Sequence, residues 1–328
     1  RELASIVRRL EELGSMCERI QHYQDYPDSV FWIERRKSPG GDPYVRYVIS
    51  PLDIGPIMHE SVFEPLHTVI CTSATLSVQQ SFEFWKERVG LGSAAYDELR
   101  ERTVEQMVDS PFDFAGRVLL ACPGDLPLPS DPRYQNALND FLLRALSVSE
   151  GGALVLFTSY SMLNEAYDAV APRLADAGIS CYRQGEDDRS RLLARFTSEV
   201  ASVLFATESF WAGVDSPGDT LKLVIMCRLP FRVPTEPITL ARVARIEQSG
   251  GNPFMQLSVP EAITRFRQGF GRLMRRSDDR GAVIVTDVRL LKKRYGSLFI
   301  GSLPETRRTF ANQESVLREL ERFLFEGG

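Results

Sequence analysis

The spacing of apolar residues becomes regular near residue 117. From there, short apolar runs of the strand type, such as RVLLACP, ALVLFTSY and AVIVTD, alternate with amphipathic helical stretches. Strands that alternate with helices of about 10 to 18 residues form βαβ units, and such units build a parallel sheet that is covered on both faces. The pattern therefore predicts an α/β domain with a doubly wound parallel sheet.

The chain before this domain has a different pattern. Residues 3–20 place apolar side chains three and four positions apart, which predicts an amphipathic helix that packs through one stripe. The runs FWIERR and YVRYVIS, joined by a Pro/Gly turn, predict a β-hairpin. A short helix bounded by prolines follows. TVIC then indicates an apolar strand that ends in small hydroxyl residues, and an amphipathic helix closes the chain.

Length and composition allow two compact domains, because the chain has 328 residues of which 43% are hydrophobic. No apolar run approaches the roughly 20 residues of a membrane-spanning helix, and no signal-like segment opens the chain. We therefore expect a cytoplasmic protein without membrane contact. The chain begins at Arg1, within a helical pattern and without Met, so we expect further sequence upstream.

The cysteines disfavour a metal site. There are five, far apart and without a CxxC pair: Cys17, Cys71, Cys122, Cys181 and Cys227. Zinc and iron–sulfur sites built from local ligands need closer spacing, so we expect no metal in this chain. Scattered cysteines with apolar neighbours are typical of reduced thiols in a protein core.

The net charge of −5 and the pI near 5.5 give no global attraction for nucleic acid, so any grip on nucleic acid must be local. A basic run taken alone is more often a solvated face than a binding site. The candidate runs are Arg35, Arg36 and Lys37, then Arg275 and Arg276, then Lys292, Lys293 and Arg294.

Ligands of an open parallel sheet bind at the carboxyl ends of its strands, so the segments after the strands are the ones to examine. Three follow predicted strands: TSATL at 72–76, FTSY at 157–160 and TESFWAGVDSPG at 207–218. The first two are weak signals, because small hydroxyl residues end many strands. For TSATL a tight turn is the alternative, and FTSY is the weaker signal of the two. A fourth segment, QGFGRLMRR at 268–276, follows a helical stretch.

The TESFWAGVDSPG segment places Phe210 and Trp211 between a polar start and the Gly213-Val-Asp215 end. Exposed aromatic side chains in such a loop suit stacking on bases or sugars. Large aromatic residues beside an α/β sheet are as often core anchors, so both interpretations stay open. Asp215 is better placed for a polar role.

The QGFGRLMRR segment carries the sharpest signal. Gln268, Arg272 and Arg275 recur at spacings of four and three, so on a helix they share one face, and two glycines leave room for a close approach. One amide and two guanidinium groups suit a polyphosphate, because arginine binds phosphate oxygens bidentately and stabilises the charge of phosphoryl transfer. A basic helix that pairs with acidic neighbours is the alternative.

Together, the order and spacing of these segments resemble the later motifs of the XPD/DinG family of superfamily 2 DNA helicases. TSATL resembles motif III, FTSY motif IV, TESFWAGVD motif V and QGFGRLMRR motif VI. The stretches SPFDF, RQG, LPFRVPTEP, GGNPF and DRG match as well. The resemblance runs from about residue 50 to 304 and is closer to the bacterial DinG branch.

The resemblance implies three parts. Residues 116–328 would be the second RecA-like helicase domain, residues 51–115 the C-terminal part of the first, and residues 1–50 the end of the arch insertion and its return to that domain. The full-length protein would be an ATP-dependent helicase that moves 5′ to 3′ on single-stranded DNA. We expect a monomer.

The resemblance also assigns the residues near the nucleotide. Gln268, Arg272 and Arg275 would act as catalytic residues that reach toward the γ-phosphate of ATP, with Gly213 and Asp215 near the nucleotide. Neither a GxxxxGK[ST] loop nor a DEAH-like acidic box is present, so ATP and Mg²⁺ would be held mainly by the missing N-terminal half. We therefore expect this chain alone to be inactive. The family's iron–sulfur insertion lies upstream in typical members.

The residues that would face the DNA path are Thr158, Ser159, Tyr160, Phe210 and Trp211. Ser73 and Thr75 would couple the nucleotide state to DNA binding. These residues do not distinguish DNA from RNA. Two other hypotheses stay open: a nucleic-acid-binding module without ATPase activity, and a nucleotide-binding protein that shares only the fold.

Overall fold

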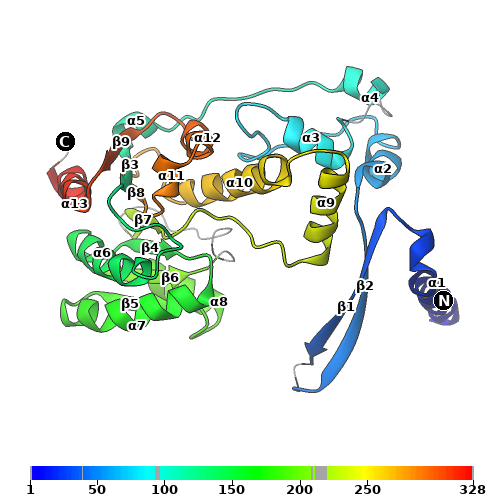
Figure 1. Ribbon diagram of the computed structural model, residues 1–328, viewed down its shortest axis with the longest axis horizontal. Helices are drawn as coiled ribbons and strands as arrows, with labels where there is room; N and C mark the ends of the chain where they lie inside the picture. The colour runs from blue at the N-terminus through cyan, green and yellow to red at the C-terminus, as the bar shows by residue number, and fades with distance from the viewer. Residues whose placement is uncertain (1, 39, 93–96, 208–209, 211–219, 327–328) are drawn as a thin grey trace. The chain divides into compact units, whose positions relative to one another are not determined.

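The computed structural model describes residues 2–38, 40–92, 97–207, 210 and 220–326 (Figure 1). The chain forms two compact units. The first comprises residues 1–77, 81–105 and 233–257, and the second comprises residues 78–80, 106–232 and 258–328. Residues 233–257 thus group with the first unit, although the sequence pattern suggested no break there.

The second unit is built on a parallel sheet of seven strands in the order β5-β6-β4-β7-β8-β3-β9. The strands are β3 (Val118–Pro123), β4 (Ala153–Leu156), β5 (Ser180–Arg183), β6 (Ser202–Ala206), β7 (Leu223–Met226), β8 (Gly281–Val285) and β9 (Arg307–Ala311). Helices separate most of them along the chain, so the expected α/β class with a doubly wound parallel sheet is confirmed. The architecture is RecA-like.

The helices of this unit cover the sheet. They are α5 (Phe114–Arg117), α6 (Tyr134–Val148), α7 (Tyr160–Asp176), α8 (Arg189–Ser198), α10 (Val259–Phe270), α11 (Arg289–Lys292), α12 (Gly296–Gly301) and α13 (Gln313–Glu321), the last followed by the π-helical turn η7 (Arg322–Glu326). The limits of α7 follow from its sequence. The Ser159 side chain accepts a hydrogen bond from the Met162 N–H at the start, and Gly178, at φ +78°, follows the end.

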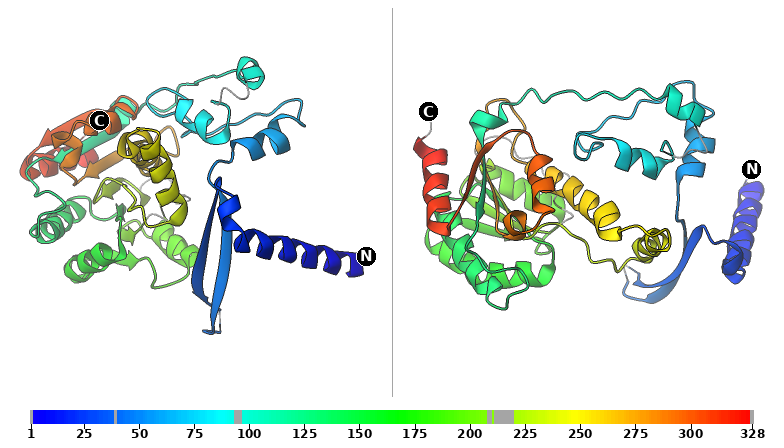
Figure 2. Two further views of the ribbon diagram at one scale, coloured as in Figure 1. Left: turned by 45° about the vertical axis from the view of Figure 1, so that its right-hand side comes forward. Right: turned by 45° about the horizontal axis from the view of Figure 1, so that its top comes forward.

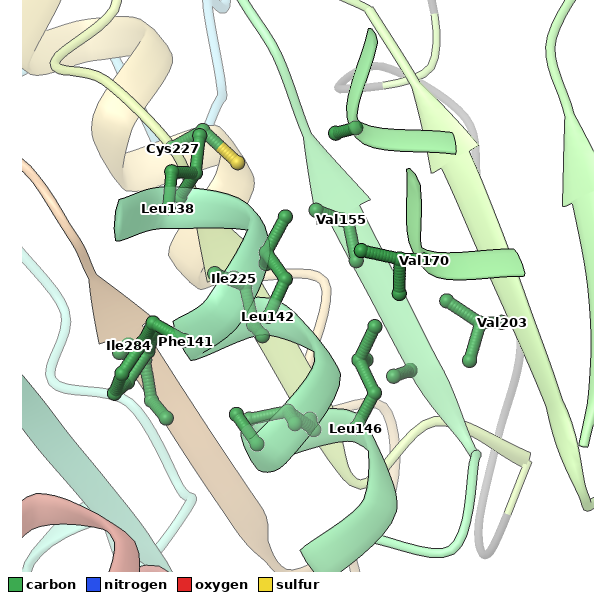
Figure 3. Close-up of a cluster of buried hydrophobic side chains, with 14 of the residues drawn as sticks. Leu138, Phe141, Leu142, Leu146, Val155, Val170, Val203, Ile225, Cys227 and Ile284 are labelled. Atoms are coloured by element: carbon green, nitrogen blue, oxygen red, sulfur yellow. The ribbon is translucent and has the colours of Figure 1, made fainter. Parts of the chain in front are cut away.

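One face of the sheet packs against α6, α7 and α13. Figure 3 shows Leu142 of α6 over the sheet residues Val155 and Ile225, with Val170 of α7 beside them. Leu154, whose side chain points to the opposite face, is also fully buried. Burial on both faces explains why these strands are continuous apolar runs rather than alternating ones.

The first unit consists of helices and one two-stranded hairpin. Its elements are α1 (Glu2–Gln21), η1 (Tyr23–Asp25), β1 (Ser29–Lys37), β2 (Pro43–Pro51), α2 (Gly55–Met58), η2 (His59–Phe63), α3 (Glu83–Val89), α4 (Asp97–Arg102) and α9 (Pro237–Gln248); the π-helical turn η6 (Phe254–Ser258) ends it. The predicted hairpin is present as a long twisted ribbon with β1 and β2 antiparallel (Figure 2).

A small core of Phe63, Val89 and Leu91 joins α2, η2 and α3. Two glycines permit this packing. A Cβ on Gly55 would lie 2.8 Å from the Cα of Gly90, and Gly90 has a φ of +87°. A larger residue at either position would push these segments apart.

Two expectations about this unit differ from the structure. TVIC does not form a strand: residues 68–73 have no regular secondary structure, and Ile70 is 81% exposed. A strand needs a hydrogen-bonded neighbour, and β1 and β2 pair only with each other. The apolar stripe of α1, expected to pack against another element, is exposed, with Leu3 at 76% and Leu10 at 63%.

Candidate nucleotide and nucleic-acid sites

The carboxyl ends of β4, β5 and β6 lie next to one another in the sheet of the second unit. The pairing continues one residue beyond β4 and β5, because the Phe157 N–H donates to the Ala206 carbonyl and the Gln184 N–H donates to the Phe205 carbonyl, both at 2.9 Å. The segments that begin at Thr158, Gln184 and Thr207 therefore meet at one edge. We call this the β4–β5–β6 edge.

Three of the residues predicted to face DNA lie at this edge. Thr158, Ser159 and Tyr160 are all exposed, and Tyr160 is 53% exposed. The Ser159 hydroxyl caps α7 by accepting from the Met162 N–H at 3.4 Å, so Tyr160 is fixed as the first residue of that helix. The structure thus places these residues together where a ligand could reach them. Their role in DNA binding stays a prediction.

Gln184 connects the three strand ends through its side-chain amide. Its Oε1 accepts hydrogen bonds from the Thr207 N–H at 2.7 Å and the Thr207 hydroxyl at 2.9 Å. Its Nε2 donates to the Tyr160 hydroxyl at 2.5 Å. The sequence offered only the RQG stretch as a family match, and nothing in it signalled these contacts, because they depend on the register of three strands.

Phe210 is only 2% exposed. Its N–H donates to the Thr207 carbonyl at 2.9 Å, and the Arg189 guanidinium lies 5.1 Å from its ring centroid. This burial favours the core-anchor interpretation over base stacking for Phe210. Trp211, Gly213 and Asp215 lie outside the described residues.

The expectation that Gln268, Arg272 and Arg275 share one helix face is wrong for the two arginines. Helix α10 ends at Phe270, so Gln268 is helical while Arg272 and Arg275 follow in a turn and an irregular segment. Gly271, at the C-cap of α10, has a low helix propensity. Burial of Leu273 and Met274, 2% and 4% exposed, stabilises the irregular segment that follows.

Asp279 holds the backbone beside Arg275. This carboxylate is 6% exposed, and its Oδ2 accepts from the N–H groups of Arg275 and Arg276, both at 2.7 Å. Arg117, directly before β3, donates to the Asp278 carbonyl at 3.0 Å. Because Arg275 and Arg276 are themselves exposed, the segment presents both arginines from an anchored backbone.

The segment with these arginines lies at the amino ends of the strands, whereas the β4–β5–β6 edge lies at their carboxyl ends. Residues 275–280 lead into the start of β8, and their neighbour Arg117 precedes the start of β3, which pairs in parallel with β8. The structure therefore brings together Thr158, Ser159 and Tyr160 at the carboxyl ends of the strands, whereas the segment with Arg272 and Arg275 leads into the amino end of β8. Within α10, burial lowers the pKa of Arg267, the neighbour of Gln268.

A buried ion pair follows β8. Asp287 is fully buried and accepts from the Leu229 N–H at 2.9 Å and the Arg289 N–H at 3.0 Å. The Arg289 guanidinium completes the pair at 2.6 Å. Burial by itself would lower the pKa of Arg289, but the hydrogen bonds to Asp287 and the negative charge of that carboxylate together raise it. This pair, which the sequence analysis missed, pins the segment after β7.

Ser73 and Thr75, the residues predicted to couple the two functions, lie in the first unit. Their hydroxyl oxygens are 3.2 Å apart, and the Thr75 N–H donates to the Ser73 hydroxyl at 3.2 Å. The segment is thus a hydroxyl-stabilised turn, the alternative that the sequence had left open for TSATL. Their coupling role stays a prediction.

Among the described residues, no three or more His, Cys, Asp or Glu side chains are grouped so that they could hold a metal ion. Cys122 and Cys227 are buried, but Cys17 and Cys71 are exposed, so the core-thiol expectation is wrong for these two. Burial raises the pKa of Cys122 to about 12. No helix in the described part of the chain is long and apolar enough to cross a membrane.

Comparison with known proteins identifies the family. The model of the helicase C-terminal domain matches residues 142–306, which include Tyr160, Gln184, Asp279 and both arginines. The chain belongs to this helicase family. It corresponds to the C-terminal region of a helicase of the DinG/XPD-like group of superfamily 2, as the motif resemblance implied.

Two relatives match most of this chain. The ATP-dependent DNA helicase YoaA of Haemophilus influenzae is 34% identical over 94% of this chain and 45% of its own length. The 3'-5' exonuclease DinG of Bacillus subtilis is 33% identical over 91% of this chain and 32% of its own length. The chain thus spans less than half of each of these two relatives.

A solved structure supports the fold. One titled XPD_Helicase superimposes with a TM-score of 0.57 over 80% of this chain and 46% of its own, at 16% identity. At that identity the likeness concerns the fold alone.

Proposed function

We propose that this chain is the motor half that follows the ATP-holding half of an ATP-dependent DNA helicase, which moves 5′ to 3′ along single-stranded DNA as a monomer. The helicase C-terminal domain match over residues 142–306 carries this proposal, because it includes both the β4–β5–β6 edge and residues 268–276, which contain Arg272 and Arg275. In this view residues 116–328 are the second helicase domain, residues 51–115 the end of the first and residues 1–50 the end of the arch insertion.

The proposed role of Arg275 is to stabilise the charge that develops on the γ-phosphate of ATP. Two features support it: Arg275 is exposed, and its backbone is anchored by the buried Asp279. A guanidinium aimed from a fixed backbone costs little to organise when the transition state forms. Gln268 and Arg272 would contact the same phosphates. ATP and Mg²⁺ would be held by the other half of the protein.

The test is the DNA-stimulated ATPase activity of the full-length protein with Arg275→Ala. We expect turnover to fall at least about a hundredfold, a discount on the 10³ to 10⁵ of related systems because Arg272 shares the task. Arg276→Ala is the matched control, since the Arg276 N–H binds the same Asp279 oxygen. It should keep turnover within about threefold of the parent.

A nucleic-acid-binding module without ATPase activity is the competing proposal. It predicts that Arg275→Ala weakens DNA binding, measured by anisotropy on the same preparation, while any turnover survives. Our proposal predicts the reverse. It also predicts no measurable ATPase in this chain alone, so a magnesium-dependent, DNA-stimulated activity in the purified chain would contradict it.

A further inference from the structure

The orientation of the Gln184 amide is fixed by its partners. The Thr207 N–H can only donate, and it points at Oε1 from 2.7 Å, so the oxygen of the amide must lie on that side. The Thr207 hydroxyl binds the same oxygen at 2.9 Å. Nε2 is thereby directed to the Tyr160 hydroxyl at 2.5 Å. In this chain of hydrogen bonds the Thr207 groups donate to Oε1, and Nε2 donates to the Tyr160 hydroxyl.

The ends of this chain differ in exposure. Thr207 is 8% exposed and directly follows the buried strand β6, and the Gln184 N–H donates to the Phe205 carbonyl. Tyr160 has 53% of its surface exposed. An exposed tyrosine ordinarily samples several rotamers and loses that freedom when a ligand stacks on it. Here the Gln184 amide holds the Tyr160 hydroxyl, so much of the rotamer freedom of the tyrosine is already lost before any ligand binds.

We propose that Gln184 is a positioning residue, which holds the Tyr160 ring as a stacking platform for a base of single-stranded nucleic acid. The inference rests on the proposed function, since it takes the β4–β5–β6 edge as the face that meets the strand. Every base has a flat aromatic face, so a fixed tyrosine ring accepts any base and gives affinity without sequence preference. Gln184 itself makes no contact with the base.

The first experiment tests the tether itself by hydrogen exchange at the Thr207 amide. Gln184→Met keeps the length of the side chain but removes its hydrogen bonds, so exchange should be at least about tenfold faster. Gln184→Glu keeps an oxygen acceptor and should restore protection. Gln135→Met is the control, because the Gln135 amide binds Asn139 within α6 at 2.9 Å. It should leave Thr207 unchanged.

The second experiment measures the affinity of the full-length protein for a single-stranded oligonucleotide that contains 2-aminopurine, whose fluorescence reports stacking. Gln184→Met should weaken binding about threefold to tenfold, part of the contribution of one stacked base. Tyr160→Phe, which keeps the ring and removes the tethered hydroxyl, should weaken it equally. The double variant should be no weaker than either single variant within about twofold.

A purely structural role for Gln184 predicts a different result when the single and double variants are compared. In that case Gln184→Met would weaken binding by the same factor in the Tyr160→Ala background as in the parent, and the inference is overturned. An unchanged affinity of Gln184→Met for the oligonucleotide also overturns the inference. In that case the proposed function stands, because the parent protein still binds the oligonucleotide. Absence of oligonucleotide binding in the parent overturns the proposed function together with the inference.

Discussion

The buried Asp287–Arg289 pair allows a stability prediction that does not depend on function. Asp287→Ala removes a fully buried carboxylate that accepts from the Leu229 N–H, the Arg289 N–H and the Arg289 guanidinium. We expect the free energy of unfolding of the second unit to fall by about 3 kcal/mol.

The magnitude follows from the groups left behind. Removal of one partner of a buried ion pair costs about 3 to 5 kcal/mol, and an unsatisfied buried N–H costs about 1 to 3 kcal/mol. Leu229 is 1% exposed, so its N–H cannot find water. The Arg289 side chain is 28% exposed and can turn partly to solvent, which places the expected loss at the lower end.

Urea unfolding followed by circular dichroism measures this loss as a lower midpoint at constant slope. Asp287→Asn keeps an oxygen acceptor for the Leu229 N–H and should lose less than Asp287→Ala. Asp278→Ala is the matched control, because Asp278 is exposed, and it should stay within about 0.5 kcal/mol. A loss below about 1 kcal/mol for Asp287→Ala would refute the reasoning.

Three further outcomes are expected. Asp279→Ala in the full-length protein should lower DNA-stimulated turnover by about tenfold or more with little change in nucleotide-free DNA binding, because the anchored backbone of Arg275 is released; Asp279→Asn should retain more turnover. Single-stranded DNA binding by this chain should be weak, with log affinity falling by about 0.7 to 2 per log unit of salt, because its local charge supports few phosphate contacts; salt-independent tight binding would contradict this. A thiol reagent near neutral pH should label exposed Cys71 much faster than Cys122, because burial raises the pKa of Cys122 to about 12 and keeps it protonated; equal rates would contradict the described burial.

The helices and strands of the second unit were largely predictable because each carries its own periodicity. Strands such as β4 are apolar throughout, as burial on both faces requires, and α7 has a serine cap and a glycine after its end. Strand β9 was missed because RRTFA lacks an apolar run: it lies at the sheet edge, where one side has no neighbouring strand.

The sequence by itself determined the α/β class, the family and the order of the candidate segments, since these depend on local patterns. The tertiary structure decided which side chains meet. Gln184 reaches Thr207 and Tyr160 only because three parallel strands end in register, and Asp279 reaches the Arg275 backbone only because α10 stops at Phe270. The apolar TVIC segment remained unpaired because no described strand lies beside it. Contacts between distant segments depend on register and packing, and no local periodicity encodes them.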